Sequence, residues 1–136
     1  MAFNILIVDD SETVRAVVGK TLRLSGIPLG EMHEAGNGRE ALDILRARWI
    51  DLVLTDINMP EMDGLEMIRR MGEDGLLATI PVIVVSSHGS KPQIERLRSQ
   101  GVMGYVQKPF TPETIREITT EVLGAFHDHR GQQDPA

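Results

Sequence analysis

Four short, almost unbroken runs of Val, Ile and Leu constrain the fold of this chain more than any other feature. They are Ile5–Val8, Leu52–Thr55, Val82–Val85 and the weaker Gly104–Gln107, each bounded by turn or charged residues. Runs of this kind are typical of strands that are buried on both faces, as in a parallel sheet. A fifth segment, Glu31–Ala35, is half polar, which favours a strand at the edge of that sheet.

Helical patterns separate these predicted strands. Five segments carry apolar residues at spacings of three and four, which places those residues on one face of a helix. Ser11 is a predicted N-cap of the first helix, Gly26 and Pro28 end it, and Thr111–Pro112 is a cap followed by proline at the start of the last helix. Right-handed crossovers then place helices on both faces, so we predict a doubly wound α/β domain with five strands and five helices.

The length and the ends of the chain agree with a single domain. A chain of 136 residues is long enough to bury one core and too short for two ordinary domains. Residues 127–136 lose apolar character entirely, and we predict a flexible C-terminal tail there after a domain over residues 1–126. The first eight residues lack the pattern of a signal peptide and no apolar run is long enough to span a membrane, so we predict a cytoplasmic protein without membrane insertion.

The charge balance restricts the partners. The chain carries 20 acidic and 14 basic residues, which gives a formal net charge of −6, and it has no cysteine. An acidic chain repels phosphate backbones, so we predict no nucleic-acid binding. Without cysteine there is neither a disulfide framework nor a thiolate metal site.

The residues that follow the predicted strands indicate where the chemistry lies. In an open α/β sheet, ligands bind at the carboxyl ends of the strands. Asp9 and Asp10 follow the first apolar run, Asp56 the third strand, Ser86 the fourth, and Lys108 lies just after the fifth. We therefore expect three carboxylates, a hydroxyl and an amine to meet at one edge of the sheet.

Three carboxylates in close proximity favour a bound cation, because neighbouring carboxylates disfavour one another's ionisation. Oxygen ligands alone suit a hard ion such as Mg²⁺, which is often held by one or two carboxylates and a substrate phosphate. Taken singly, each residue has another interpretation: Asp10, for example, would also suit the positive end of the helix that begins near Ser11. The joint placement of all these residues at successive strand ends favours the site.

Four motifs carry a resemblance to a known family. They are Val8-Asp9-Asp10-Ser11, the run from Asp56 to Leu65, Val85-Ser86-Ser87, and the run from Gly104 to Phe110. With them the sequence resembles the response-regulator receiver domains of two-component signalling over about residues 3–126. We expect no output domain after the receiver, and in that respect the sequence resembles the stand-alone regulators of the CheY type. The resemblance implies a flavodoxin-like fold with strand order 2-1-3-4-5.

The resemblance also implies a role for each residue at the strand ends. Asp56 would be the phosphoacceptor for a histidine kinase or a phosphotransfer protein. Mg²⁺, or Mn²⁺ in its place, would be held by Asp9, Asp10, Asp56 and the backbone carbonyl of Asn58. Lys108 would stabilise the phosphoryl oxygens. The protein would be a signalling protein, with no enzymatic activity beyond its own phosphoryl transfer and autodephosphorylation.

The resemblance further implies a conformational switch. The Ser86 hydroxyl would move to the phosphoryl group and Tyr105 would rotate inward, which changes a protein-binding surface on helix four, strand five and helix five. Tyr105 also has the simpler interpretation of a half-buried packing residue. A cis bond before Pro109 would aim Lys108 into the site. We predict a monomer that passes its signal to a protein target in chemotaxis or another two-component pathway.

Three alternatives remain at this stage. A phosphate-storing shuttle in a phosphorelay would use the same residues. An aspartate-nucleophile Mg²⁺ phosphatase of the haloacid-dehalogenase type would need a second aspartate two residues after Asp56, where Asn58 stands. A flavodoxin-like electron carrier would need a phosphate-binding loop after the first strand, where Asp9 and Asp10 would repel the flavin phosphate.

Overall fold

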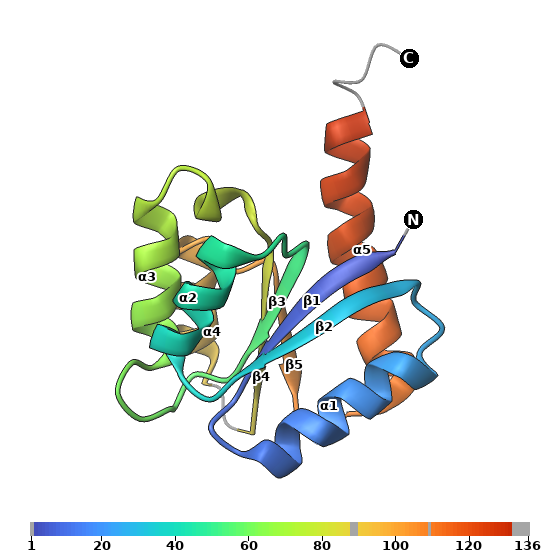
Figure 1. Cartoon of the computed structure of the whole chain (residues 1–136), viewed down its shortest axis with the longest axis horizontal. Coiled ribbons are helices and arrows are strands. Elements are labelled where there is room, and N and C mark those ends of the chain that lie inside the picture. Colours follow the sequence, from blue (N-terminus) through green and yellow to red (C-terminus); the bar gives the residue numbers. More distant parts are fainter. Residues whose placement is uncertain (1, 88–89, 109, 132–136) are drawn as a thin grey trace.

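The computed structural model describes residues 2–87, 90–108 and 110–131, and the side chains within them up to residue 124. Strands and helices alternate along the chain (Figure 1). The elements, in chain order, are β1 (Phe3–Val8), α1 (Glu12–Leu24), β2 (Leu29–Ala35), α2 (Gly38–Ala47), β3 (Leu52–Thr55), α3 (Gly64–Glu73), the 3-10 helix η1 (Leu77–Thr79), β4 (Val82–Ser86), α4 (Lys91–Ser99), β5 (Gly104–Gln107) and α5 (Pro112–Gly131).

The five strands form one parallel sheet in the order β2-β1-β3-β4-β5. This confirms the predicted flavodoxin-like strand order and the edge position of the half-polar β2. In the register, Val8 at the end of β1 pairs with Ala35 of β2 on one side and with Thr55 of β3 on the other. The carboxyl ends of the three strands therefore meet at the same edge.

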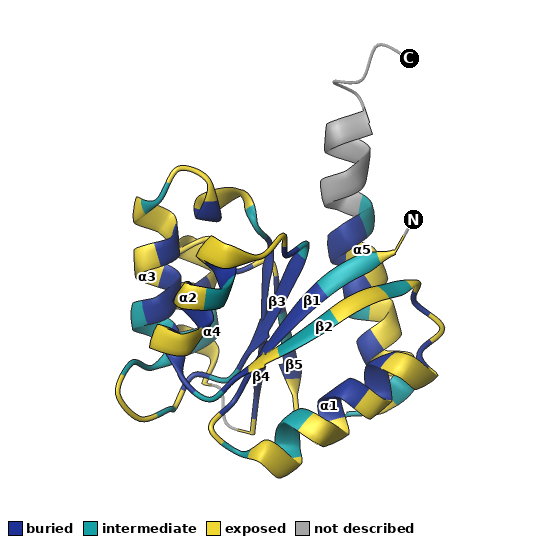
Figure 2. Ribbon diagram, in the orientation of Figure 1, coloured by how far each residue is buried: buried dark blue, intermediate teal, exposed yellow. Residues whose placement is uncertain are grey.

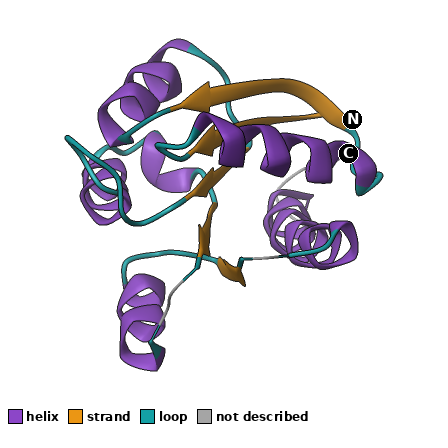
Figure 3. Cartoon of the chain, turned by 90° about the horizontal axis from the view of Figure 1, so that it is seen from below, coloured by secondary structure: helices purple, strands orange, loops and turns teal. Residues whose placement is uncertain are grey.

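The helices cover both faces of the sheet, as Figure 3 shows in the view from below. Leu6 and Val8 of β1 belong to the core shared with α2, α3 and α4, whereas Ile5 and Ile7 belong to the core shared with α1 and α5. The alternation follows from the period of two along a strand. The strands at the centre are buried on both sides (Figure 2), which explains their unbroken apolar sequence.

The predicted helix ends agree with the structure. The Ser11 hydroxyl accepts a hydrogen bond from the amide of Val14 at 3.2 Å, and the Thr111 hydroxyl accepts one from the amide of Thr114 at 3.1 Å. Such caps satisfy amides that the helix itself leaves without a partner, and each stabilises by about 1 kcal/mol. Gly26, just past the end of α1, has a φ of 82°, which a residue with a Cβ rarely adopts.

Two segments differ from the sequence-based expectation. A turn of 3-10 helix, η1, lies between Gly75 and Pro81, where the sequence analysis placed no helix; Oδ1 of Asp74 accepts hydrogen bonds from the amides of Leu76 and Leu77 at its start. The backbone of residues 127–131, predicted as part of the tail, continues α5. No proline interrupts the helix before Pro135, and residues 132–136 lie outside the described part of the chain. Among the described helices, none is both long and apolar enough to cross a membrane.

Candidate functional site

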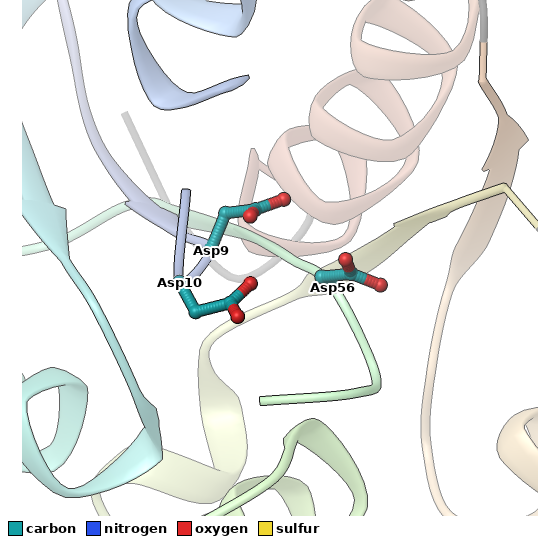
Figure 4. A group of neighbouring side chains, drawn as sticks. All are labelled: Asp9, Asp10 and Asp56. Atoms are coloured by element: carbon teal, nitrogen blue, oxygen red, sulfur yellow. The ribbon is translucent and has the colours of Figure 1, made fainter. Parts of the chain in front are cut away.

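Two neighbouring strands of the sheet, β1 and β3, bring three carboxylates together. Asp9 and Asp10 directly follow β1, and Asp56 directly follows β3. The amide of Asp56 donates to the carbonyl of Val8 at 2.9 Å, so the pairing of the two strands continues into the site. One carboxylate oxygen from each residue lies within 4.8 Å of the others, and Figure 4 shows the three side chains close together at the ends of the two strands.

Backbone amides hold two of these carboxylates in place. Oδ1 of Asp9 accepts a hydrogen bond from the amide of Ser11 at 2.9 Å, and Oδ1 of Asp56 accepts one from the amide of Ile57 at 2.7 Å. Asp9 is buried, with 5% of its surface exposed, whereas Asp56 is half-buried and Asp10 is exposed. The site thus has a buried carboxylate at its base and two that solvent or a ligand can reach.

Lys108 joins the carboxylates of the two strands. Its amide donates to the carbonyl of Ser86 at 2.9 Å, which places the residue beside the end of β4. Its Nζ donates to Oδ2 of Asp9 at 2.9 Å and to Oδ2 of Asp56 at 3.3 Å. Burial by itself lowers the pKa of Lys108, but the hydrogen bond and charge of Asp9, followed by those of Asp56, outweigh it and raise the pKa above the ordinary value of 10.5. The amine is therefore a fixed positive charge at neutral pH.

The donor set fits a hard divalent cation. All three side chains offer carboxylate oxygens, and their mutual repulsion is only partly compensated by the one ammonium group of Lys108. Ions such as Mg²⁺ prefer oxygen ligands, whereas softer metals prefer nitrogen or sulfur. Asn58, whose carbonyl was predicted as a further ligand, lies exposed in the loop two residues after Asp56.

The two predicted switch residues lie on neighbouring strands. Ser86 is the last residue of β4 and is buried. Tyr105, in β5, pairs in register with Val84 of β4 and packs against the core under α2, α3 and α4. Within the described residues its hydroxyl is buried without a hydrogen-bond partner. Pro109, for which a cis bond was predicted, lies outside the described residues.

Comparison with known proteins identifies the family. Residues 5–120 match the model of the response regulator receiver domain. The chain belongs to the response regulator receiver family. A chemotaxis protein CheY homolog from Campylobacter jejuni is 36% identical to it over 122 residues, 89% of this chain and 92% of the relative. The chemotaxis protein CheY1 of Helicobacter pylori is 38% identical over 122 residues, 89% of this chain and 97% of the relative.

The solved structures agree with this assignment. The chemotaxis protein CheY4 of Vibrio cholerae superposes with a TM-score of 0.80 at 30% identity, over 90% of this chain and 99% of the other. This chain is therefore a CheY-like receiver, a signalling protein rather than an enzyme, and the phosphatase and electron-carrier alternatives are set aside. Its acidic triad is typical of the Mg²⁺ site of receivers, and a histidine kinase is the phosphodonor that the family implies.

Two residues of this receiver contribute to the site although the sequence analysis assigned them no role. Arg15 of α1 donates from Nη1 to the backbone carbonyl of Asp9 at 2.6 Å and from Nε to Glu34 of β2 at 3.0 Å. Gly64 begins α3 and donates its amide to the carbonyl of Ile57 at 2.7 Å. The resemblance motif contained Gly64, but no spacing pattern in the sequence pointed to either contact.

Proposed function

We propose that Asp56 of this receiver accepts a phosphoryl group from a phosphohistidine of a histidine kinase or phosphotransfer protein, with Mg²⁺ held by Asp9, Asp10, Asp56 and the carbonyl of Asn58. One observation carries the proposal. The Asp56 carboxylate is reachable from solvent, contacts the Lys108 ammonium and lies near the carboxylates of Asp9 and Asp10. A nucleophile, a fixed positive charge and a set of cation ligands are the parts that phosphoryl transfer requires.

The contacts of Asp56 assign its two oxygens different roles. Oδ1 is tied to the amide of Ile57 at 2.7 Å, whereas Oδ2 has only the longer contact of 3.3 Å to Lys108. We assign Oδ2 as the attacking oxygen. As its bond to phosphorus forms, the bond from phosphorus to the donor's imidazole nitrogen breaks, and that nitrogen takes up a proton. Hydrolysis by water later releases inorganic phosphate and restores the carboxylate.

Lys108 is positioned to stabilise the negative charge of the phosphoryl group during its transfer. Its ammonium already lies beside Oδ2, and a short movement brings it to a phosphoryl oxygen while Asp9 keeps it anchored at 2.9 Å. A bound Mg²⁺ would neutralise part of the negative charge on the phosphoryl oxygens. Such preorganised positive charge stabilises a loose transition state without reorganisation at the moment of transfer.

The readout of phosphorylation is proposed to pass through Ser86 and Tyr105 to the surface formed by α4, β5 and α5. Ser86 supports this proposal because its carbonyl accepts the amide of Lys108, so the end of β4 is tied directly to the site. Tyr105 supports it because a buried hydroxyl without a partner costs about 1–3 kcal/mol, which favours an alternative orientation of the ring. The similarity to chemotaxis proteins leads us to propose a chemotaxis target for this surface.

The single tyrosine of the chain allows a direct test of this readout. Fluorine NMR of protein labelled with 3-fluorotyrosine reports on Tyr105 alone. Addition of acetyl phosphate and Mg²⁺ is expected to shift the resonance in the wild type, and to leave it unchanged in Asp56→Asn and Ser86→Ala. A phosphorylated wild type whose resonance does not move, and which passes its phosphoryl group to a phosphotransfer protein, would instead indicate a shuttle.

The contacts of Arg15 lead to a prediction for the cation site. Arg15→Ala removes the donor that holds the Asp9 carbonyl at 2.6 Å, and residues that orient ligands typically change metal affinity by about tenfold or more. Isothermal titration with Mg²⁺ is expected to show a loss of affinity of about tenfold. The control is Arg23→Ala in the last turn of the same helix, an exposed position. Equal affinities of the two variants would refute a positioning role for Arg15.

A further inference from the structure

A groove at the amino-terminal edge of the sheet takes no part in the receiver chemistry. It lies between the end of α2, η1 and the segments that precede β3 and β4, and its volume is about 330 Å³. Its apolar lining includes Leu45, Ile50, Leu77 and Pro81. We call it the α2–η1 groove. The acidic site lies at the carboxyl ends of the same strands, so the two sites are at opposite ends of the sheet (Figure 1).

Two large apolar side chains stand exposed at the groove. Trp49 is 68% exposed and Leu76 is 83% exposed, and both belong to its lining. Exposed apolar residues that are scattered singly are normal, whereas a cluster around a concave surface marks an interaction site. A volume of this size accommodates one or two apolar side chains of a partner.

Hydrogen bonds hold Trp49 in its exposed position. The indole Nε1 donates to Oδ1 of Asp51 at 3.0 Å, and the Trp49 carbonyl accepts from Nδ2 of Asn4 at 3.1 Å. Oδ2 of Asp51 in turn accepts from the amide of Asn4 at 2.8 Å. Because these bonds tie the segment to β1, the wall of the groove is formed before any partner arrives, which lowers the ordering cost of binding.

The charged side chains around the groove are two arginines and two aspartates, which differ in their hydrogen bonding. Both oxygens of Asp51 are occupied, and Oδ1 of Asp74 accepts from the amides of Leu76 and Leu77. By contrast, the exposed guanidinium groups of Arg46 and Arg48 make no hydrogen bond or ion pair with any other described residue. Guanidinium groups present several N–H donors that match carboxylates.

We propose that the α2–η1 groove is a second docking surface of this receiver, for a segment of a partner protein in which an apolar side chain is flanked by aspartate or glutamate. The apolar side chain enters between Trp49 and Leu76, and the acidic residues pair with Arg46 and Arg48. Charge complementarity supports this occupant, because the exposed guanidinium groups of Arg46 and Arg48 have no ion-pair partner among the described residues and would pair with its carboxylates. Since the groove lies at the far end of the sheet from Asp56, docking and phosphorylation are compatible.

A peptide selection tests the chemistry of the occupant. A phage library of random linear peptides is selected on the wild-type protein and counter-selected on the double variant Arg46→Glu/Arg48→Glu. We expect the retained peptides to combine Leu, Phe or Trp with Asp and Glu. Retention of basic peptides, or no retention above the level of the double variant, would overturn the proposal.

The single tryptophan of the chain then locates the binding. We expect a retained peptide, made synthetically, to shift the Trp49 emission to shorter wavelength and to bind the double variant about tenfold more weakly. The matched control reverses two exposed arginines elsewhere, Arg23→Glu/Arg116→Glu, and is expected to bind within about twofold of the wild type. Asp56→Asn is expected to bind the peptide as the wild type does.

Other results of these experiments would overturn the proposal. An unchanged Trp49 emission, or equal binding to both double variants, would place the peptide elsewhere and contradict the proposal. Self-association of the wild type in sedimentation velocity that Arg46→Glu/Arg48→Glu abolishes would assign the groove to a second copy instead. Circular dichroism and phosphorylation by acetyl phosphate confirm that the variants fold, because all four arginines are exposed.

Discussion

Gly64→Ala is expected to lower the free energy of unfolding by about 2–4 kcal/mol. A Cβ at this position would lie 2.2 Å from the carbonyl oxygen of Asp56 and 3.0 Å from the Cα of Ile57. Both are backbone atoms of the loop after β3, which cannot give way as the end of a flexible side chain can. The loop and the start of α3 would have to separate, and the hydrogen bond of 2.7 Å from the Gly64 amide to the Ile57 carbonyl would be lost.

The same displacement is expected to affect the site, because the carbonyl that moves belongs to Asp56, the proposed phosphoacceptor. Chemical denaturation measures the stability, and the rate of labelling by acetyl phosphate measures the site. Gly72→Ala in the same helix is the matched control, since a Cβ there meets no atom within 4 Å. It is expected to stabilise by up to about 1 kcal/mol through helix propensity. If both alanine variants had the same stability, the close approach of Gly64 to Asp56 would be refuted.

Lys108→Ala is expected to have the second large effect, a loss of about 1–3 kcal/mol of stability in the absence of divalent cations. The substitution leaves the buried Asp9 carboxylate beside that of Asp56 without the ammonium group that now contacts both, at 2.9 Å and 3.3 Å. Added Mg²⁺ is expected to recover part of this loss, because it supplies the missing positive charge. Lys20→Ala, at an exposed position of α1, is the control and is expected to be nearly neutral.

The ion pairs of Lys108 contribute to stability, and the pH dependence of that contribution has a definite sign. The pKa of Lys108 is raised in the folded state above its ordinary value of 10.5, so the folded protein holds the proton more tightly than the unfolded chain does. The contribution is fully present below about pH 10.5 and is lost as the pH rises through the folded-state pKa. We expect the wild type to lose stability in this alkaline range and Lys108→Ala to show less of that loss.

Lys108→Ala is also expected to accept a phosphoryl group from acetyl phosphate without the shift of the Tyr105 resonance.

The strands, and the site residues at their carboxyl ends, were predictable from the sequence. Buried strands need apolar runs, so the bounds of β3 and β5 match their predicted segments, and parallel strands bring Asp9, Asp10 and Asp56 to one edge. The strand order rested on the family resemblance, since periodicity alone does not order strands.

The contacts of Arg15 and Gly64 at the site were not predictable in this way. Arg15 reaches the Asp9 carbonyl across a helix turn, and Gly64 matters because a backbone passes close to it. Neither contact produces a spacing pattern. The α2–η1 groove depends on which faces of Trp49 and Leu76 remain uncovered once α2 and η1 are packed, and that is a property of the folded surface alone.

We propose that Asp56 is the phosphoacceptor and that its phosphorylation depends on Mg²⁺. Intact-mass spectrometry after incubation with acetyl phosphate tests it most directly, on the wild type and on Asp56→Asn, each with Mg²⁺ and with a chelator. We expect a single phosphoryl adduct on the wild type that requires Mg²⁺ and is absent from Asp56→Asn. A single aspartyl adduct that persists in Asp56→Asn, or a folded wild type that remains unlabelled by acetyl phosphate and by a phosphorylated kinase alike, would contradict it.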